Sequence, residues 1–504
     1  MFNQKILCLG NNSSDTDVRT NELAKQDNTV NYGLCTEHNV IPIQAGYYHT
    51  SLTDMPPGQV IKFAQNFDLV VLLDQPMNEW SHWKPLLTTY KAVLEIEETT
   101  PVEYKNNKNI KQLEYWNNYL KTNPSFCLYP WVLLTEDAGQ VNLCARSHYT
   151  IANNIKEVGD FKTSEKFQEV RESMLKGKRL PKHCKECYYY EDKGIESSRL
   201  FETMDWAVKL GLESIDDLEK LENPHYYEIR LSNKCNIMCR SCKPEHSHLI
   251  DKEYTEHNIK FMGEQTFAYS NFDHVNLDAL NDKTRIYLTG GEPSVMAEFY
   301  DFMQKCIDIG KTDFDFTIGT NAQSYTPKFW KLVNQFSNMN FTVSVDGYGR
   351  INDYQRWLSD FDTVMANAHA LEDAGHSVTF LIVPGMYNVT NLHLLLEYLD
   401  EHFPKTALYL QINRNSNQSA YNHPNAELVI ESMRKCQQTQ VYHSDGRSCK
   451  TTIDSILDYY LEQPTFNPLL LANFFTYNDQ LDKARGVQLK DYIPELDECR
   501  KYLK

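Results

Sequence analysis

The sequence predicts an α/β protein whose largest domain is a partly open barrel of six parallel strands joined by helices. Between residues 223 and 415, short strands alternate with helical stretches, which favours parallel pairing through crossover connections. Polar side chains recur at alternate positions along the strands, so one face of the sheet is apolar and the other is polar. The segments richest in cysteine and glycine follow the first two strands, and the carboxyl ends of parallel strands share one edge.

The polar face is the reason for expecting a barrel and not a doubly wound sheet. Strands that helices cover on both sides are apolar on both faces. One polar face instead predicts that the strands surround a wet, ligand-sized cavity. The polar positions, strand by strand, are Glu228, Arg230 and Ser232; Arg285, Tyr287 and Thr289; Thr317 and Asn321; Ser344 and Asp346; Gln411 and Asn413.

The remainder of the chain divides into three further segments by changes in pattern. Residues 1–118 read as a small α/β domain of unknown role, with buried strands expected in KILCLG (5–10), FDLVVLLD (67–74) and KAVLEI (91–96). Residues 119–222 carry four cysteines and an acidic helical run, and residues 416–504 are mainly helical. The barrel at 223–415 is therefore expected to have a cysteine-rich segment directly before it.

Composition excludes several classes of protein. The chain has 50 basic and 68 acidic residues, a net charge of −18, and no basic run, which argues against duplex nucleic acid as a partner. No apolar stretch is long enough for a membrane span, and the apolar run at the N-terminus is too short for a secretory signal. We expect a cytoplasmic protein with no membrane partner. Its 13 cysteines would stay mostly reduced there, so clustered cysteines indicate metal more than disulfides.

The tightest cysteine cluster lies in LSNKCNIMCRSCKPE (231–245), after the first strand of the barrel. Cys235, Cys239 and Cys242 provide three thiolates, whereas a four-iron cluster is saturated by four. Three ligands leave one iron open, and an open metal position can bind a reactant. For this spacing alone, a zinc site or inert thiols is the alternative.

The C-x3-C-x2-C spacing, followed by TGGEP after the next strand, resembles the radical SAM superfamily over about residues 225–415. The resemblance implies a partial (β/α)6 barrel and a [4Fe–4S] cluster that is held by these three cysteines and binds S-adenosylmethionine. Reductive cleavage of that molecule gives a 5′-deoxyadenosyl radical, which abstracts hydrogen from a substrate.

The same resemblance implies residues that contact S-adenosylmethionine. The methionine part would meet Gly290, Gly291, Glu292 and Pro293, and this GGEP element would receive its ammonium group. The ribose or methionine groups would meet Asn321, Ser344 and Asp346, and the adenine would meet Val383. Ser241 departs from the family pattern, because many relatives have an aromatic residue just before the third cysteine. That departure leaves adenine contact at this position to the main chain.

A second cysteine set precedes the barrel, with the pattern C-x11-G-x4-C and then C-x2-C. Taken alone, this pattern is as typical of a zinc knuckle. Beside the barrel it resembles the auxiliary-cluster twitch element, a truncated relative of the SPASM domain, in a subgroup where that element comes first. SSR in GIESSRLFE (194–202) and the stretch YNDQLDKARGVQLKDYIPEL (477–496) also resemble that subgroup. The implied ligands of an auxiliary [4Fe–4S] cluster are Cys127, Cys144, Cys184 and Cys187.

The resemblance implies an oxidoreductase or a modifying enzyme. If the auxiliary cluster takes or relays an electron, the reaction would be a dehydrogenation, a cross-link or another modification of a peptide, a protein or a small polar metabolite. An external electron donor such as a flavodoxin or ferredoxin would be a partner. The alternative is a non-catalytic binding protein with a degenerate barrel, stabilised by zinc or an iron–sulfur cluster.

Overall fold

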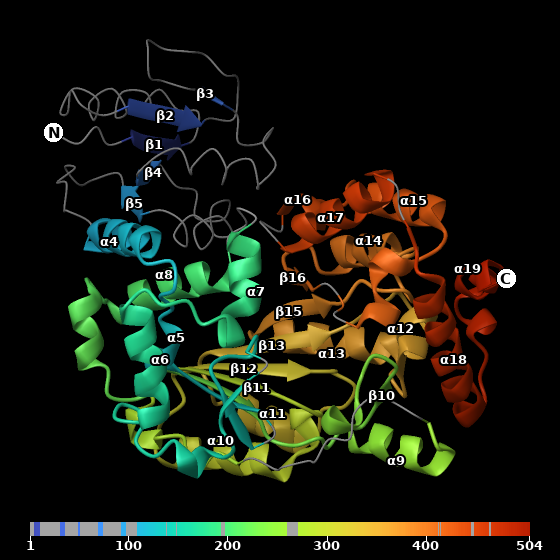
Figure 1. Ribbon diagram of the computed structural model, residues 1–504, viewed down its shortest axis with the longest axis horizontal. Helices are drawn as coiled ribbons and strands as arrows, with labels where there is room; N and C mark the ends of the chain where they lie inside the picture. Colours follow the sequence, from blue (N-terminus) through green and yellow to red (C-terminus); the bar gives the residue numbers. More distant parts are fainter. Residues whose placement is uncertain are drawn as a thin grey trace.

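The computed structural model describes residues 5–10, 31–35, 49–50, 69–73, 92–96, 108–137, 139–147, 149–192, 197–259, 271–411, 413, 415–444, 448–462 and 465–503. Within these ranges the fold has a large sheet of nine strands, a small sheet of five strands, a two-stranded sheet and many helices (Figure 1).

The large sheet has nine strands in the order β16-β15-β13-β12-β11-β9-β6-β7-β8. All neighbours from β16 to β6 are parallel, and β7 and β8 are antiparallel additions. The mixed α/β class with a parallel sheet is thereby confirmed, and the six strands expected at 223–415 pair in sequence order. These are β9 (Tyr226–Arg230), β11 (Arg285–Thr289), β12 (Asp315–Thr320), β13 (Met339–Ser344), β15 (Ser377–Ile382) and β16 (Ala407–Leu410).

One face of this sheet is buried under helices. Alternate strand residues such as Ile229, Ile286 and Phe316 are at most 1% exposed, and they belong to one hydrophobic cluster. The ring of Phe316 lies 5.8 Å from that of Phe302 in a neighbouring helix. The helices that follow successive strands are α10 (Ala297–Asp308), α11 (Pro327–Val333), α13 (Phe361–Asp373) and α14 (Leu392–His402).

The opposite face carries the polar residues and is only partly buried. Glu228 and Tyr287 both have intermediate exposure, in the alternation that the sequence predicts. Asp137, on a neighbouring strand, has a side chain that is 39% exposed. Solvent therefore reaches the polar face along the strands.

The cysteine-rich segment is built into the same sheet. Its strands are β6 (Leu133–Asp137), β7 (Gln140–Asn142) and β8 (Thr150–Ala152), and β6 pairs in parallel with β9. Strand β6 was not predicted from the sequence. Its five residues are too few to show a clear local pattern, and they form a strand because they pair with β9. The helices of this segment are α4 (Lys108–Thr122), α5 (Tyr129–Val132), α6 (Glu165–Leu175), α7 (Pro181–Glu191) and α8 (Ser198–Leu210).

The small sheet has five parallel strands in the order β3-β2-β1-β4-β5. They are β1 (Lys5–Gly10), β2 (Asn31–Cys35), β3 (His49–Thr50), β4 (Leu69–Leu73) and β5 (Ala92–Ile96). Strands β1, β4 and β5 lie where the sequence predicts strands. The helical stretches expected between them fall outside the described residues.

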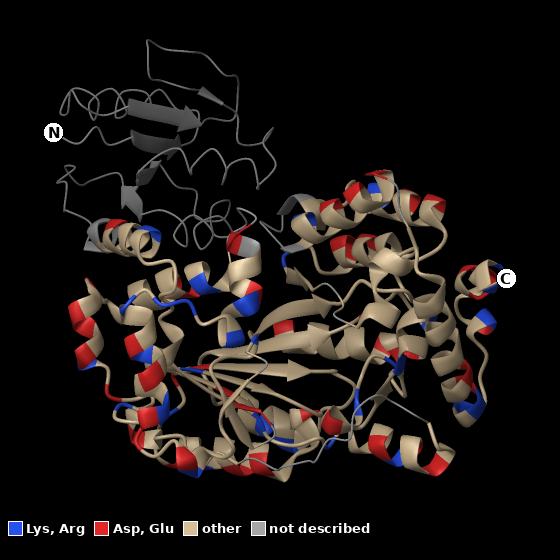
Figure 2. Cartoon of the chain, in the orientation of Figure 1, with Lys and Arg blue, Asp and Glu red and all other residues tan. Residues whose placement is uncertain are grey.

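The C-terminal part is helical, with α15 (Ala426–Cys436), α16 (Gln440–Ser444), α17 (Ser448–Glu462), α18 (Pro468–Arg485) and α19 (Pro494–Asp497). Acidic and basic residues are interspersed on the described helices, α10, α15 and α18 among them (Figure 2). Among the described helices, none has both the length and the apolar character that a membrane span requires.

Candidate functional site

The residues singled out in the barrel segment lie on the loops that follow its strands. The three-cysteine loop follows β9, TGGEP follows β11, Asn321 follows β12, Asp346 follows β13 and Val383 follows β15. Because these strands are parallel neighbours, the loops share one edge of the sheet. Asn321 illustrates the result, since its Nδ2 lies 3.9 Å from the Cys235 sulfur and donates to Asn236 Oδ1 at 2.7 Å.

Cys235, Cys239 and Cys242 lie close enough together to affect one another. All three are free thiols. Burial raises the pKa of Cys235 to about 12, and the nearby Cys239 adds to this effect. Burial also raises the pKa of Cys242, and the charges of the other two thiols raise it further. Metal binding to such thiols must displace their protons, because the thiolate is the ligand.

Arg240, between the second and third cysteines, anchors the cysteine loop to the C-terminal helix α18. Its side chain is fully buried, and Nη2 pairs with Asp482 at 2.7 Å while Nη1 donates to Asn478 at 3.1 Å. Nε donates to the carbonyl of Tyr354, in helix α12 (Arg350–Gln355), at 2.8 Å. The position of the loop therefore depends on residues more than one hundred positions away in the chain.

Glu292 of TGGEP is completely buried and joins its loop to the next one. One carboxylate oxygen accepts from Thr320 Oγ1 at 2.9 Å and from Ser294 N at 3.2 Å, and the other accepts from Asn321 N at 2.6 Å. Burial raises the pKa of this carboxyl group. Among the described residues, the oxygen that bonds Asn321 N accepts only this one hydrogen bond, so it has room for a further donor. Pro293, which follows, is buried at the start of a 3-10 turn.

Gly290 and Gly291 are required by close packing within the protein. Their φ angles are +84° and +51°, and a Cβ at Gly290 would lie 1.9 Å from Cγ of Arg230. A Cβ at Gly291 would lie 2.0 Å from the carbonyl oxygen of Lys234. The expected role of these glycines is access for the cofactor, and the structure adds a second requirement, the contact of TGGEP with β9 and the cysteine loop.

Asp346 is 2% exposed and is held from two sides. It accepts from the backbone N–H of Val383 at 3.0 Å and pairs with Arg356 at 2.8 Å. Val383 and Ser344, at the ends of β15 and β13, are both half-buried. The Asp346 carboxylate therefore ties together the ends of neighbouring strands.

Arg356 is a residue of this site that sequence reasoning missed. It lies on the short strand β14 (Arg356–Trp357), which pairs antiparallel with β10 (Met238–Cys239) so that Arg356 is opposite Cys239. Burial raises the pKa of Cys239, and the Arg356 charge lowers it. The Nε of Arg356 is buried and has no partner in the described part of the chain. No local pattern marks a two-residue bridge, so sequence alone offers no signal for this neighbour.

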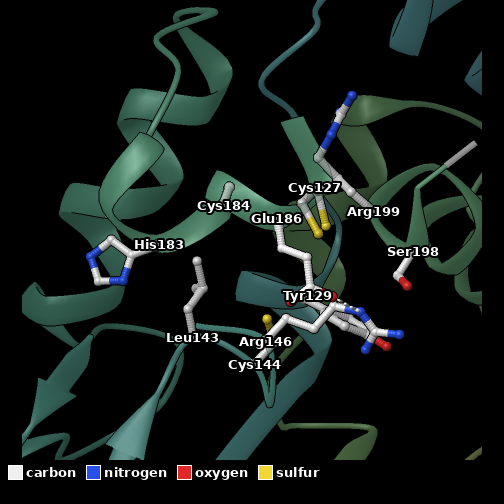
Figure 3. A pocket seen from close by; sticks show the side chains of 11 residues that line it. Cys127, Tyr129, Leu143, Cys144, Arg146, His183, Cys184, Glu186, Ser198 and Arg199 are labelled. Carbon is white, nitrogen blue, oxygen red and sulfur yellow. Dashed lines mark ion pairs between the residues drawn. The ribbon is translucent and has the colours of Figure 1, made fainter. Parts of the chain in front are cut away.

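The four cysteines of the second set line one pocket (Figure 3). Three separate segments bring them together: the loop before α5, the loop after β7, and helix α7. Burial raises the pKa of Cys144 and of Cys184 to about 12. The pocket is lined by Cys127, Cys144, Cys184 and Cys187 with Tyr129, Leu143, Arg146, His183, Glu186, Ser198 and Arg199.

Arg199, from the SSR stretch, holds two of these segments in place. Its guanidinium bonds both oxygens of Glu191, at 2.9 and 2.6 Å, and donates to the carbonyl of Phe126. Its backbone N–H donates to the Cys187 sulfur, which lowers the pKa of that thiol against the larger, raising effect of burial. The segment before Cys127 is thereby fixed to the end of α7.

No three His, Cys, Asp or Glu side chains converge on the position of a single metal ion within the ranges that the structure describes. Convergence of this kind is the geometry of a mononuclear zinc site. The thiolates of a four-iron cluster bind different irons, so they need not converge on one point.

Comparisons with known proteins give no family assignment. No protein-family model and no curated protein matches the chain. Solved structures with partial similarity include anSMEcpe with bound AdoMet, at 15% identity and a TM-score of 0.31 over 42% of this chain and 57% of that one. Streptococcus suis SuiB bound to the precursor peptide SuiA matches at 14% identity and a TM-score of 0.30, over 66% of this chain and 64% of that one.

The cobalamin-dependent S-adenosylmethionine radical enzyme OxsB, with aqua-cobalamin bound, matches at 10% identity and a TM-score of 0.26, over 79% of this chain and 52% of that one. The chain thus spans 57%, 64% and 52% of the lengths of these three proteins, less than two thirds of each. Similarity this low says nothing about the activity of this chain.

Proposed function

We propose that this chain is a radical SAM enzyme of the subgroup in which a twitch-like auxiliary segment precedes a partial (β/α)6 barrel. The observation that carries the proposal is the placement of Cys235, Cys239 and Cys242 together at the same sheet edge as TGGEP. A cluster held by three thiolates has one iron free to bind S-adenosylmethionine. When bound, this pair supplies a 5′-deoxyadenosyl radical that abstracts hydrogen from the substrate.

The residues present fit such a cluster. The three thiols are free and close to one another, and Arg240 holds their loop rigidly against α18. The positive charge of Arg356 lies beside Cys239 and offsets part of the negative charge of the thiolates. In this proposal the S-adenosylmethionine contacts come from the loops already described: Gly290, Gly291, Glu292, Pro293, Asn321, Ser344, Asp346 and Val383.

The pocket lined by the second set of cysteines is proposed to hold the auxiliary [4Fe–4S] cluster. Its four cysteines supply the four thiolates that saturate a cube, so this cluster would move electrons and would not bind substrate. If it accepts the electron left on the substrate, the net reaction is a two-electron oxidation, such as a dehydrogenation or a cross-link. A flavodoxin or ferredoxin would supply the electron that starts the reaction.

The substrate in this proposal is a peptide, a protein side chain or a small polar metabolite. The polar, partly exposed sheet face supports a wet interior that would admit any of them.

Metal analysis of anaerobically purified protein tests the proposal. Two four-iron clusters predict about eight irons and an equal number of sulfides per chain, with absorbance at about 400 nm. Stoichiometric zinc without iron would instead establish the alternative, a zinc-stabilised binding protein.

Cysteine variants test the two sites separately. Cys239→Ala is expected to abolish release of 5′-deoxyadenosine from S-adenosylmethionine, and Cys187→Ala is expected to retain some uncoupled release while product formation stops. Cys306→Ala is the matched control, because Cys306 is completely buried in α10 and lies in neither cysteine set. Equal loss of 5′-deoxyadenosine in Cys239→Ala and Cys187→Ala would show that the second cluster is structural and not redox-active.

A further inference from the structure

We propose that the substrate binds on the polar face of β6 and β9, at Thr135, Glu228 and Arg230, through an uncharged group that both donates and accepts hydrogen bonds. This inference rests on the proposed function, since it assigns the substrate site of that enzyme. Peptide amides and paired hydroxyls share the required chemistry.

The three residues form a row in which individual polar atoms lack a hydrogen-bond partner among the described residues, although Arg230 also pairs with Asp137 through Nη1. Thr135 is opposite Glu228 in the parallel register of β6 and β9, so both side chains lie on the polar face. Thr135 is 3% exposed, and its hydroxyl has no hydrogen-bond partner among the described residues. The Arg230 Nε is likewise buried without a partner there. Buried polar groups in native proteins are normally bonded, so unbonded ones on a solvent-reached face point to a ligand.

Glu228 completes the row with a carboxylate that makes no hydrogen bond or ion pair within the described ranges. Burial is the largest influence on it and raises its pKa to about 7. Near neutral pH this carboxyl group therefore accepts hydrogen bonds when ionised and donates one when protonated.

The charges nearby disfavour an anionic ligand. Arg230 already pairs with Asp137 at 2.6 Å, and Arg146 pairs with Glu186 at 3.6 Å. An anion would meet the carboxylate of Glu228 without an unpaired cation to offset it. A neutral donor and acceptor would bond to Glu228 and to the Arg230 Nε without adding charge.

The row lies between the two cysteine sites. On one side, the Arg230 stem packs against Gly290 of TGGEP, so closely that a Cβ there would reach 1.9 Å from Arg230 Cγ. On the other side, burial and the charge of Glu228 raise the pKa of Cys144. Burial raises the pKa of both Glu228 and Cys187, and the charge of Arg146 lowers it. A ligand on this row would therefore be near the loop proposed to hold S-adenosylmethionine and near the proposed electron acceptor.

Saturation-transfer NMR on the full chain, purified anaerobically, tests the inference with two probes: N-acetylglycinamide for amides and xylitol for paired hydroxyls. Thr135→Val and Glu228→Met should each weaken binding of a probe by about fivefold to tenfold, the usual cost of one lost hydrogen bond. Thr379→Val is the matched control, because Thr379 is half-buried at an alternate position of β15, away from the row. It should leave binding unchanged.

Binding of N-acetylglycinamide alone would support a peptide source, binding of xylitol alone a polyol source, and binding of both the shared chemistry. Failure of both probes to bind the parent chain, or binding that neither substitution weakens, would overturn the inference. Circular dichroism of each variant shows whether it is folded, and Glu228→Met alone carries the test if Thr135→Val is unfolded. The proposed function fails by a different result, the absence of 5′-deoxyadenosine from the parent chain with S-adenosylmethionine and a reductant.

Discussion

Replacing Arg240 with methionine is predicted to destabilise the protein strongly and to release the cysteine loop. The Arg240 side chain is completely buried, and its Nη2 lies 2.7 Å from an oxygen of Asp482, which is 10% exposed. Methionine keeps much of the volume but leaves that carboxylate buried without its cation. Breaking a buried ion pair on one side costs about 3–5 kcal/mol. At about 1.4 kcal/mol per decade, that is a change of roughly two to three and a half orders of magnitude in the unfolding equilibrium.

Equilibrium unfolding in urea measures this loss against a matched control. Lys176→Met removes an exposed pair with Glu172, at 3.0 Å with side chains 72% and 64% exposed, and should cost at most about 0.5 kcal/mol. The double variant Arg240→Met with Asp482→Leu should recover part of the loss, because no buried charge remains. Recovery is expected to be incomplete, since Tyr354 Oη and the backbone N–H of Leu489 also donate to Asp482.

A loss for Arg240→Met no larger than that for Lys176→Met would refute the reasoning. It would mean that the loop between Cys239 and Cys242 does not depend on α18 for its position. If the proposed cluster is present, the same variant should also lower the iron content toward about four per chain, the content of one remaining cube.

Two further predictions concern single positions. Gly291→Ala should lower the melting temperature much more than Gly310→Ala. Both glycines have positive φ, so both substitutions strain the backbone. Only at Gly291 would the new Cβ also clash, 2.0 Å from the carbonyl oxygen of Lys234, because no described atom lies within 4 Å at Gly310. The strain at Gly310 alone is worth about 1–2 kcal/mol, and equal losses in both variants would contradict the packing argument. For Glu228, the folded pKa of about 7 exceeds the ordinary 4.5, so the folded state binds the proton more tightly and stability falls as pH rises through this window. Urea unfolding at several pH values should show a contribution of at most about 1.4 kcal/mol per pH unit that is absent in Glu228→Gln. Identical pH profiles would show that the pKa of this carboxyl group is not raised in the folded protein.

Much of the main sheet was predictable because its signals are local. Strands β9, β11 and β12 lie in the predicted segments, since alternation of polar and apolar residues depends only on neighbouring positions. The spacing of Cys235, Cys239 and Cys242 is likewise a local property, and it places all three on one loop. Strand β6 was missed because its pairing partner lies about ninety positions along the chain, beyond any local pattern.

The sequence by itself determined which residues could carry metal chemistry, the α/β class of the protein and the strands whose ends bear the motif loops. Only the tertiary structure decided that four cysteines from three segments line one pocket, that Arg356 lies opposite Cys239, and that Arg240 is held by Asp482, 242 positions away. Periodicity and spacing are encoded over a few residues and need no knowledge of the rest of the chain. Contacts between distant segments depend on how whole helices and strands pack, and that free energy is shared among many side chains at once.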